Sequence, residues 1–128
     1  MTCEVDAVGV ILSVGSNCGD RYSNVEEGID WLSSHVCVSG VSDIYSTPDC
    51  HGGPTHYMNA VVAGTTNLSI EQLEVLCKAH EVEKGRDEKA RAAGMVPLDI
   101  DVVIYNGKII REKDYSRTFF KIGFSQLA

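Results

Sequence analysis

The sequence predicts an α+β sandwich in which two helices cover one face of a β-sheet. Three observations indicate this fold: a length of 128 residues, a hydrophobic content of 44% beside 23% charged residues, and an alternation of strand-like and helix-like segments. Because single domains usually contain about 100 to 200 residues, this length leaves room for one domain. We therefore expect residues 1–128 to form a single packed domain.

The first half of the chain is predicted to contain a helix between two strands. Val8–Val14 is a short apolar run that ends in a turn, which is typical of a buried strand. Apolar residues then recur every three or four positions and predict a helix over 21–34, with Ser23 and Glu26 as a capping box at its start. The next segment is rich in β-branched residues, and its alternation slips at Ser39-Gly40, which predicts a strand bent by a bulge.

The second half is predicted to contain a strand, a helix and a final strand with a hairpin. Alternation over Tyr57–Thr65 indicates a strand, and Ser69 with Gln72 would form a capping box at the start of the second helix. Leu98–Ile104 alternates again and leads into Asn106-Gly107, a strong signal for a type I′ hairpin. This order matches the βαββαβ pattern of the ferredoxin-like fold with an added C-terminal hairpin, and it leaves one sheet face free to carry a site.

The net charge and the cysteine positions limit which partners and which cellular compartment we expect for this protein. The chain has 11 Lys and Arg residues against 18 Asp and Glu residues, a net charge of −7, so we expect no binding to nucleic acid or to a membrane. The N-terminal residues lack the basic and apolar segments of a secretory signal, and we expect a cytoplasmic protein. The cysteines, at positions 3, 18, 37, 50 and 77, show neither disulfide nor zinc spacing and are predicted to be thiols. Nothing in the composition demands an oligomer, so we expect a monomer or a weak dimer.

Asp99 and Asp101 are the clearest candidates for chemistry. They are two residues apart in a predicted strand, so their side chains leave the same face, about 6 to 7 Å apart. Hard oxygen ligands of this kind suit Mg²⁺, which binds one or two carboxylates together with substrate phosphates. A solvated acidic pair is the alternative, but Asp is depleted in strands and the opposite face of this strand is apolar. We therefore predict a metal site here.

Two loops are weaker candidates. Gly15–Asp20 follows a strand and precedes a helix, so it is either a phosphate-binding loop or a tight turn; it lacks the Walker and dinucleotide patterns. Tyr45–His56 is rich in turn residues and predicts an exposed loop of the kind that often covers a ligand. His51 and His56 have no carboxylate or cysteine at ligand spacing, so we expect ordinary loop histidines there.

Five short motifs occur in order along residues 8–106. They are Val14–Asp20 (VGSNxGD), Ile44–Pro48 (IYxTP), Tyr57–Ala60 (YMNA), Glu81–Arg86 (EVEKGR) and Leu98–Val102 (LDIDV). Together, and at these intervals, they closely resemble the 6-hydroxymethyl-7,8-dihydropterin pyrophosphokinase family. The ferredoxin-like fold of that family agrees with the pattern of strands and helices predicted above.

The resemblance implies a reaction. It implies transfer of pyrophosphate from the co-substrate ATP to the hydroxymethyl oxygen of a reduced pterin, giving AMP in folate synthesis. It also implies two Mg²⁺ ions held by Asp99 and Asp101, and no covalent nucleophile. The pterin-binding residues that it implies are Thr47, Pro48, Cys50, Tyr57, Asn59 and Phe119. An amide such as that of Asn59 suits a pterin edge, because it offers both donors and an acceptor.

The resemblance also implies a set of charged residues that contact ATP. They are Lys78, Glu81, Arg86, Lys89, Arg91 and Arg117. Arg86 and Lys89 are further expected to take part in catalysis at the phosphates. Basic residues at a helix end are also common as a solvated surface, and this alternative stays open for both.

The sequence departs from the family pattern just before the aspartate pair. In place of further arginines and a tryptophan it has Glu88, Ala92, Ala93 and Val96. Segment 81–91 then carries four basic and four acidic residues, a net charge of 4 − 4 = 0. Loss of one preorganised donor at a developing charge slows a reaction about 10²- to 10³-fold. Candidates to replace the missing cations are Arg111, Arg117 and Lys121.

Three functions stay open on these grounds. The first is the pyrophosphokinase, with reduced activity. The second is a non-catalytic pterin- or metal-binding relative that has lost the arginine clamp for ATP. The third is a structural interaction domain, which explains the fold but gives no reason for so many pocket residues to occur together.

Overall fold

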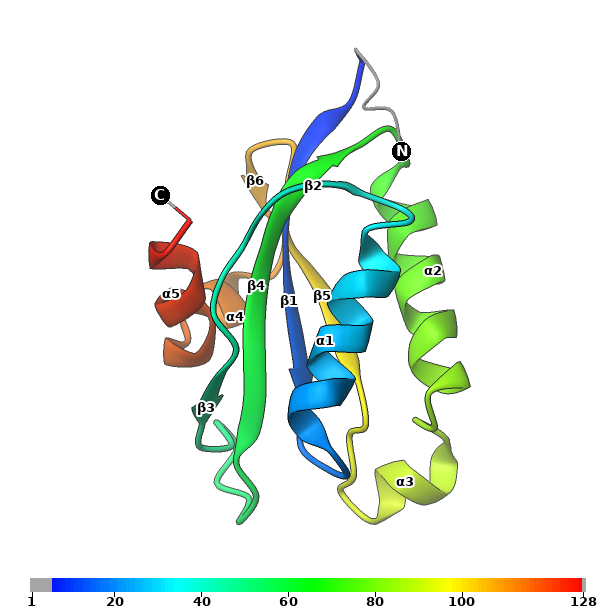
Figure 1. The fold of residues 1–128 in the computed structure, drawn as a ribbon, viewed down its shortest axis with the longest axis vertical. Helices are drawn as coiled ribbons and strands as arrows, with labels where there is room; N and C mark the ends of the chain where they lie inside the picture. Colours follow the sequence, from blue (N-terminus) through cyan, green and yellow to red (C-terminus); the bar gives the residue numbers. More distant parts are fainter. Residues whose placement is uncertain (1–5, 128) are drawn as a thin grey trace.

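A computed structural model describes residues 6–127 as a mixed α+β fold built on one antiparallel sheet of six strands (Figure 1). The strands are β1 (Val8–Ser16), β2 (Cys37–Val41), β3 (Tyr45–Thr47), β4 (Tyr57–Thr66), β5 (Asp99–Tyr105) and β6 (Lys108–Ile109). The helices are α1 (Arg21–Leu32), α2 (Ile70–Glu83), α3 (Glu88–Ala92), α4 (Glu112–Ser116) and α5 (Thr118–Ser125). The strand order is β2-β4-β1-β5-β6, and β3 follows β2 along the same edge of β4.

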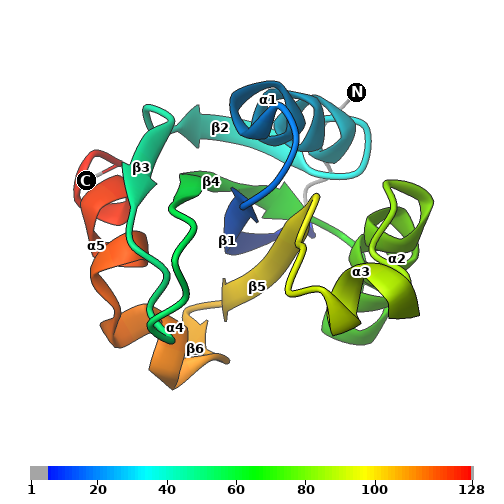
Figure 2. The same ribbon diagram turned by 90° about the horizontal axis from the view of Figure 1, so that it is seen from below.

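Helices α1 and α2 share one face of the sheet, as Figure 2 shows from below. Because strand residues alternate between the two faces, every second residue of β1, β4 and β5 projects toward these helices. The main core on this face comprises Val10, Leu12, Val14, Val25, Leu32, Val36, Ala60, Val62, Leu73, Cys77, Leu98, Ile100 and Val102. Gly28 permits the close approach of α1, since a Cβ atom there would lie 2.9 Å from Leu98.

The opposite face is partly covered by the C-terminal helices. Phe120 of α5 packs on Val61 and Val103 in a second, smaller core. The Tyr45 hydroxyl fastens α5 to β3, because it accepts a hydrogen bond from the Gly123 amide at 3.0 Å and donates one to the Phe119 carbonyl. The face that was expected to be free to carry a site is therefore open only beyond α4 and α5, two helices that were not predicted.

The elements that were predicted from local signals are confirmed, with one correction at a cap. Ser69 and Gln72 exchange the two hydrogen bonds of the capping box at α2. Asn106 and Gly107 have φ angles of 51° and 77°, as a type I′ hairpin requires. At α1 the cap is Asp20 rather than Ser23, because the Asp20 carboxylate accepts the Ser23 amide at 3.1 Å and satisfies a free N–H of the first turn.

The bent strand is confirmed as two pieces. The register against β4 shifts between Val38 and Gly40, and the chain leaves the sheet after Val41 before β3 resumes the pairing. Helices α3, α4 and α5 were not predicted. α3 and α4 have five residues each, which is too short for a helical period to show in the sequence.

Three cysteines are thiols, as predicted. Cys18, Cys50 and Cys77 are free. Cys37 is disulfide-bonded, so the prediction of a thiol is wrong there, since sequence spacing does not show which cysteines meet in space. Cys3 lies outside the described residues. Across residues 6–127, no helix combines the length and the apolar character that crossing a membrane requires.

Trp31 of α1 and His80 of α2 pack against each other at the interface between the two helices. Their rings stack with centroids 4.1 Å apart and planes 3° apart. Both ring nitrogens of His80 are buried and find no hydrogen-bond partner among residues 6–127. Burial therefore lowers the pKa of His80 below its ordinary value of 6.5.

Acidification is expected to destabilise the fold through His80. The unfolded chain binds this proton near pH 6.5, whereas the folded chain binds it only at lower pH, so stability falls as the pH drops below 6.5. Between about pH 7 and pH 5, the free energy of unfolding should fall less in His80→Phe than in the wild type. Urea titrations followed by Trp31 fluorescence measure this, with His51→Gln in an exposed loop as the control. Equal pH dependence of His80→Phe and wild type would contradict the prediction.

Candidate active site

A hollow of about 230 Å³ opens on the uncovered part of the sheet. Strands β1, β4 and β5 contribute its floor, the loop between β3 and β4 contributes one wall, and α4 with the start of α5 contributes another. The lining residues are Ser13, Val14, Gly15, Thr47, Pro48, Asp49, Cys50, His51, Tyr57, Asn59, Arg86, Asp99, Asp101, Arg111, Asp114 and Phe119. Strand ends and loops thus meet here around a group of carboxylates.

Asp99 and Asp101 both line this hollow, as their alternation in β5 predicts. Burial, together with the neighbouring Asp101, raises the pKa of Asp99 to about 7. Burial also opposes ionisation of Asp101, but a hydrogen bond from Asp99 and the charge of Lys78 outweigh it and lower the pKa of Asp101. Near neutral pH the two carboxyl groups therefore share a proton for part of the time.

Lys78 reaches the carboxylates from α2. Its Nζ donates to Asp101 Oδ1 at 2.9 Å, to Glu81 Oε2 at 2.8 Å and to the Ile100 carbonyl at 3.2 Å. It also lies 3.7 Å from Asp99 Oδ1. Burial opposes the charge on Lys78, but the surrounding carboxylates outweigh it and raise its pKa. The ammonium group thus stays charged and joins α2 to both acidic residues of β5.

Arg86 and Glu81 complete the network behind the hollow. Arg86 Nη1 donates to Glu81 Oε1 and to Asp99 Oδ1, both at 2.7 Å. The Glu81 side chain is only 2% exposed, and its Oε2 also accepts the Ile100 amide at 2.9 Å. The structure therefore does not place Glu81 among the residues open to a nucleotide, but among those that hold the site together.

The residues expected on the pterin side all line the hollow. Thr47 enters from β3, Tyr57 and Asn59 enter from β4, Pro48 and Cys50 enter from the intervening loop, and Phe119 belongs to α5. β3 and β4 pair at Thr47 and Tyr57, which brings the two groups together. Asn59 Nδ2 donates to Thr47 Oγ1 at 2.6 Å and to the Tyr57 carbonyl at 3.4 Å, so the buried amide is held in one orientation.

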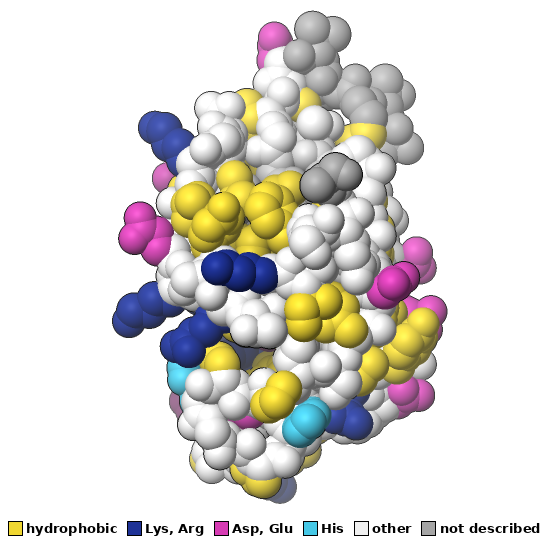
Figure 3. All heavy atoms as spheres, turned by 90° about the vertical axis from the view of Figure 1, so that its left-hand side faces the viewer, with side chains coloured by type: hydrophobic (Ala, Val, Ile, Leu, Met, Phe, Trp, Pro, Cys, Tyr) yellow, Lys and Arg dark blue, Asp and Glu magenta, His cyan; other side chains and the backbone are white. Residues whose placement is uncertain are grey.

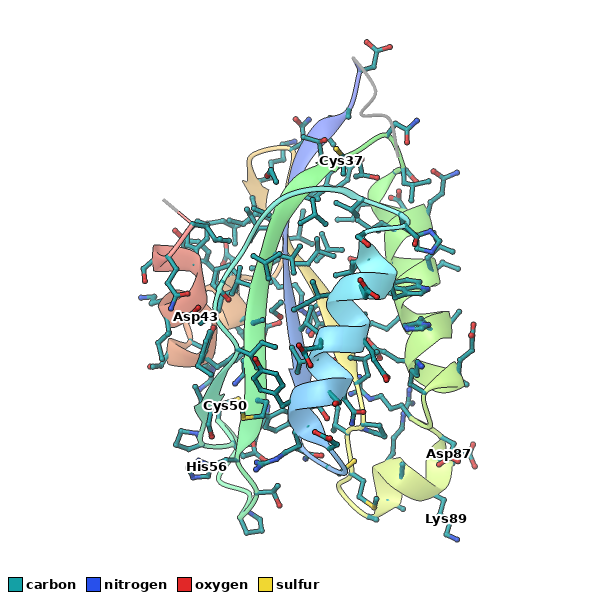
Figure 4. The ribbon with its side chains drawn as sticks, viewed as in Figure 1. Cys37, Asp43, Cys50, His56, Asp87 and Lys89 are labelled. Atoms are coloured by element: carbon teal, nitrogen blue, oxygen red, sulfur yellow. The ribbon has the colours of Figure 1, made fainter. Side chains whose placement is uncertain are left out.

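The basic residues expected on the nucleotide side are divided. Arg86 lines the hollow and Lys78 contacts its carboxylates. Lys89 and Arg91 are exposed on α3 and do not line it. Figure 4 shows Lys89 on the outer side of α3, whereas Cys50 lies beside β3 on the other side of the molecule. Arg117 lines a second hollow of about 660 Å³ next to the first one.

Sequence reasoning missed several residues of the hollow. Asp49 and Asp114 were not predicted as site residues, and Arg111 was predicted only as a candidate substitute cation. Asp114 lies in α4 and Asp49 lies in the β3–β4 loop, where no periodic signal places a side chain. Ser13 was available from the alternation of β1, since it faces the same side of the sheet as Asp101, its partner in the register.

The donor set fits Mg²⁺. Asp99 and Asp101 present carboxylate oxygens in one wall of the hollow, and such oxygens are the ligands that this ion prefers. Within residues 6–127, no group of three or more His, Cys, Asp or Glu residues is arranged to hold a metal ion. An ion bound at the pair would therefore complete its shell with water and substrate phosphates, as is usual for Mg²⁺.

Removal of the Glu81 carboxylate is expected to destabilise the protein strongly. In Glu81→Ala the Ile100 amide loses its acceptor and Arg86 and Lys78 lose a buried counter-charge, which costs about 3 kcal/mol. Glu83→Ala removes an exposed carboxylate from the same helix and should change the free energy of unfolding by less than about 0.5 kcal/mol. Urea unfolding measures both. Similar stabilities of the two variants would show that the Glu81 network does not support the fold.

Comparison with known proteins agrees with this geometry. The family model for 7,8-dihydro-6-hydroxymethylpterin-pyrophosphokinase matches residues 11–128. A folate synthesis bifunctional protein of Arabidopsis thaliana is 33% identical over 107 residues, which are 81% of this chain and 22% of that protein. A 2-amino-4-hydroxy-6-hydroxymethyldihydropteridine pyrophosphokinase of Aquifex aeolicus is 30% identical over 105 residues, 81% of this chain and 65% of the relative. The chain thus spans less than two thirds of the length of either relative. A protein of the same name from Porphyromonas gingivalis is 33% identical over 101 residues, 76% of this chain and 69% of the relative.

By its motifs, its hollow and the match over residues 11–128, the chain belongs to the 7,8-dihydro-6-hydroxymethylpterin-pyrophosphokinase family.

Proposed function

We propose that this chain transfers pyrophosphate from ATP to the hydroxymethyl oxygen of 6-hydroxymethyl-7,8-dihydropterin, giving AMP, as a step of folate biosynthesis. One observation carries the proposal: Asp99 and Asp101 line the same hollow as the six side chains expected to bind the pterin. Membership of the family supports it, because relatives of this family are named as pyrophosphokinases and as folate synthesis proteins.

The proposal includes the domain and its setting. Residues 1–128 would form one ferredoxin-like domain, which the strand order β2-β4-β1-β5 and the placement of α1 and α2 on one face support. The cytoplasm, a monomer or weak dimer, and the absence of nucleic-acid and membrane partners stay predictions. The net charge of −7 supports the last of these.

The pterin would lie between β3, β4 and α5. Asn59 is buried and its amide is oriented by Thr47, so it offers a fixed set of donors and an acceptor to one edge of the ring. Tyr57 and Phe119 line the same hollow and provide aromatic surfaces for stacking. Pro48 and Cys50 close the wall that the loop contributes.

The phosphates of ATP would lie at the aspartate end of the hollow. Asp99 and Asp101 would hold Mg²⁺, which neutralises phosphate charge and aligns the attacking and leaving oxygens when it is bound. Arg86 would contact phosphate, since it lines the hollow and makes both of its ion pairs through Nη1. Lys78 keeps Asp101 ionised and in place. No side chain needs to form a covalent bond in such a transfer, so positioning and charge are the main contributions of the protein.

A specific observation favours a second function. Lys89 and Arg91, expected at the nucleotide, are exposed on α3 outside the hollow, and Glu88 and Ala92 occupy neighbouring positions of that helix. A non-catalytic pterin- or metal-binding relative would keep the hollow and lack this part of the phosphate clamp. Production of AMP separates the two functions.

Loss of either aspartate is expected to abolish most of the activity. With ATP, Mg²⁺ and 6-hydroxymethyl-7,8-dihydropterin, the wild type should release AMP, and Asp99→Asn or Asp101→Asn should lower the rate at least about 100-fold. Asp43→Asn removes an exposed carboxylate outside the hollow and should keep the wild-type rate. AMP is quantified by chromatography. Pterin binding without AMP release in the wild type would reject the enzyme in favour of the non-catalytic relative.

The pterin is expected to protect Cys50 from alkylation. Cys50 is exposed in the wall of the hollow, whereas Cys18 is half-buried and does not line it. Burial raises the pKa of Cys77 to about 12, so this thiol should react only on unfolding. Mass spectrometry after timed exposure to iodoacetamide should show slower labelling of Cys50 when the pterin is added, with Cys18 unchanged. Equal labelling of Cys50 with and without pterin would argue against a pterin in this hollow.

A further inference from the structure

The hollow at the aspartates continues into the second hollow along α4. The two share Cys50, His51, Arg111 and Asp114, and Arg111 lies at their junction. The second hollow is also lined by Lys113 and Arg117. Figure 3 shows several Lys and Arg side chains at one edge of this side of the molecule, below a patch of apolar side chains. With Glu112 and Asp114 also in its lining, the second hollow carries a net charge of 3 − 2 = +1, so a polyanion at the aspartates meets positive charge on the side of α4, away from α3.

Arg111 is tied to the acidic centre of the site. Its Nη1 lies 3.8 Å from Asp101 Oδ1, so a phosphate that meets Asp101 lies within reach of the guanidinium. The side chain is 46% exposed, which leaves donors open to a ligand. Guanidinium groups are weakly hydrated and match phosphate oxygens in a fork geometry, so this is the side chain best suited to such a contact.

The position of Arg111 is fixed by its backbone and by Asp114. The Ile110 and Arg111 amides both donate to the Val103 carbonyl, at 2.7 and 3.4 Å, which fastens this segment to β5. The Tyr115 amide donates to the Arg111 carbonyl at 2.9 Å. Arg111 Nε donates to Asp114 Oδ2 at 2.5 Å, so the guanidinium is turned with its Nη groups toward Asp101.

We propose that Arg111 contacts the phosphates of the nucleotide and that Asp114 is the positioning residue that aims it. This inference rests on the proposed function, because it supposes a nucleotide at Asp99 and Asp101. The cations of α3 do not reach the hollow. Arg111 would supply positive charge from the opposite side of the site. The contact selects for a polyphosphate and leaves the pterin side unchanged.

The inference is tested by nucleotide affinity beside catalysis. Arg111→Ala should raise the KM for ATP about 10- to 100-fold, the usual effect of a lost hydrogen bond to a charged group. Arg111→Lys should restore part of this loss, and Asp114→Asn should raise the KM several-fold with a smaller effect on kcat. Calorimetric titration with α,β-methylene ATP should show the same order of affinities. The affinity for the pterin should stay within about twofold of the wild type.

Lys108→Ala provides the matched control. It removes one positive charge from the exposed hairpin next to Arg111 but outside both hollows, and it should leave ATP affinity unchanged. Equal ATP affinities of Arg111→Ala and wild type, or a parallel loss of pterin affinity, would overturn the inference. Absence of AMP from the wild type would reject the proposed function, while the titration with α,β-methylene ATP would still decide whether Arg111 binds the nucleotide.

Discussion

The candidate site depends on the ion pairs and hydrogen bonds of the buried Glu81 carboxylate. A charge that is 2% exposed is tolerated only when it is paired and fully hydrogen-bonded, and Glu81 meets this condition through the Ile100 amide, Lys78 and Arg86. These contacts join the last turns of α2 to β5. They also fix the cations that meet Asp99 and Asp101. The electrostatics of the hollow thus follow from a residue that does not line it.

The parts of the fold that could be predicted carry their signals locally. An apolar run identified β1, alternation identified β4 and β5, a capping box identified the start of α2, and Asn106-Gly107 identified the hairpin. Helix α5 could not be identified in this way, because its order depends on Phe120 packing against Val61 and Val103, residues far away in the sequence. This helix decides how much of the sheet face stays open, so the extent of the site was also beyond prediction.

The residues of the candidate site likewise divide into those that the sequence could place and those that it could not. Asp99, Asp101, Tyr57 and Asn59 could be placed, because strand alternation fixes the face of each side chain. The ion pairs among long side chains could not be predicted, because the groups that these side chains reach depend on how α2 and α4 lie against β5. Glu81 did leave a signal: it stands four positions after Cys77 on the apolar face of the predicted helix, where an acidic residue indicates a buried and paired carboxylate.

Charge balance explains what kind of nucleotide such a site can accept. Lys78, Arg86 and Arg111 pair with Glu81, Asp99, Asp101 and Asp114, so the network carries a net charge of 3 − 4 = −1 when all seven groups are ionised. A bare triphosphate would meet carboxylates that repel it and cations that are already paired. A triphosphate that carries divalent cations would instead present positive charge to Asp99 and Asp101, which would leave Arg86 and Arg111 free for phosphate oxygens. Under the proposed function, the paired network would therefore discriminate against metal-free nucleotide, in keeping with the excess of carboxylates in the hollow.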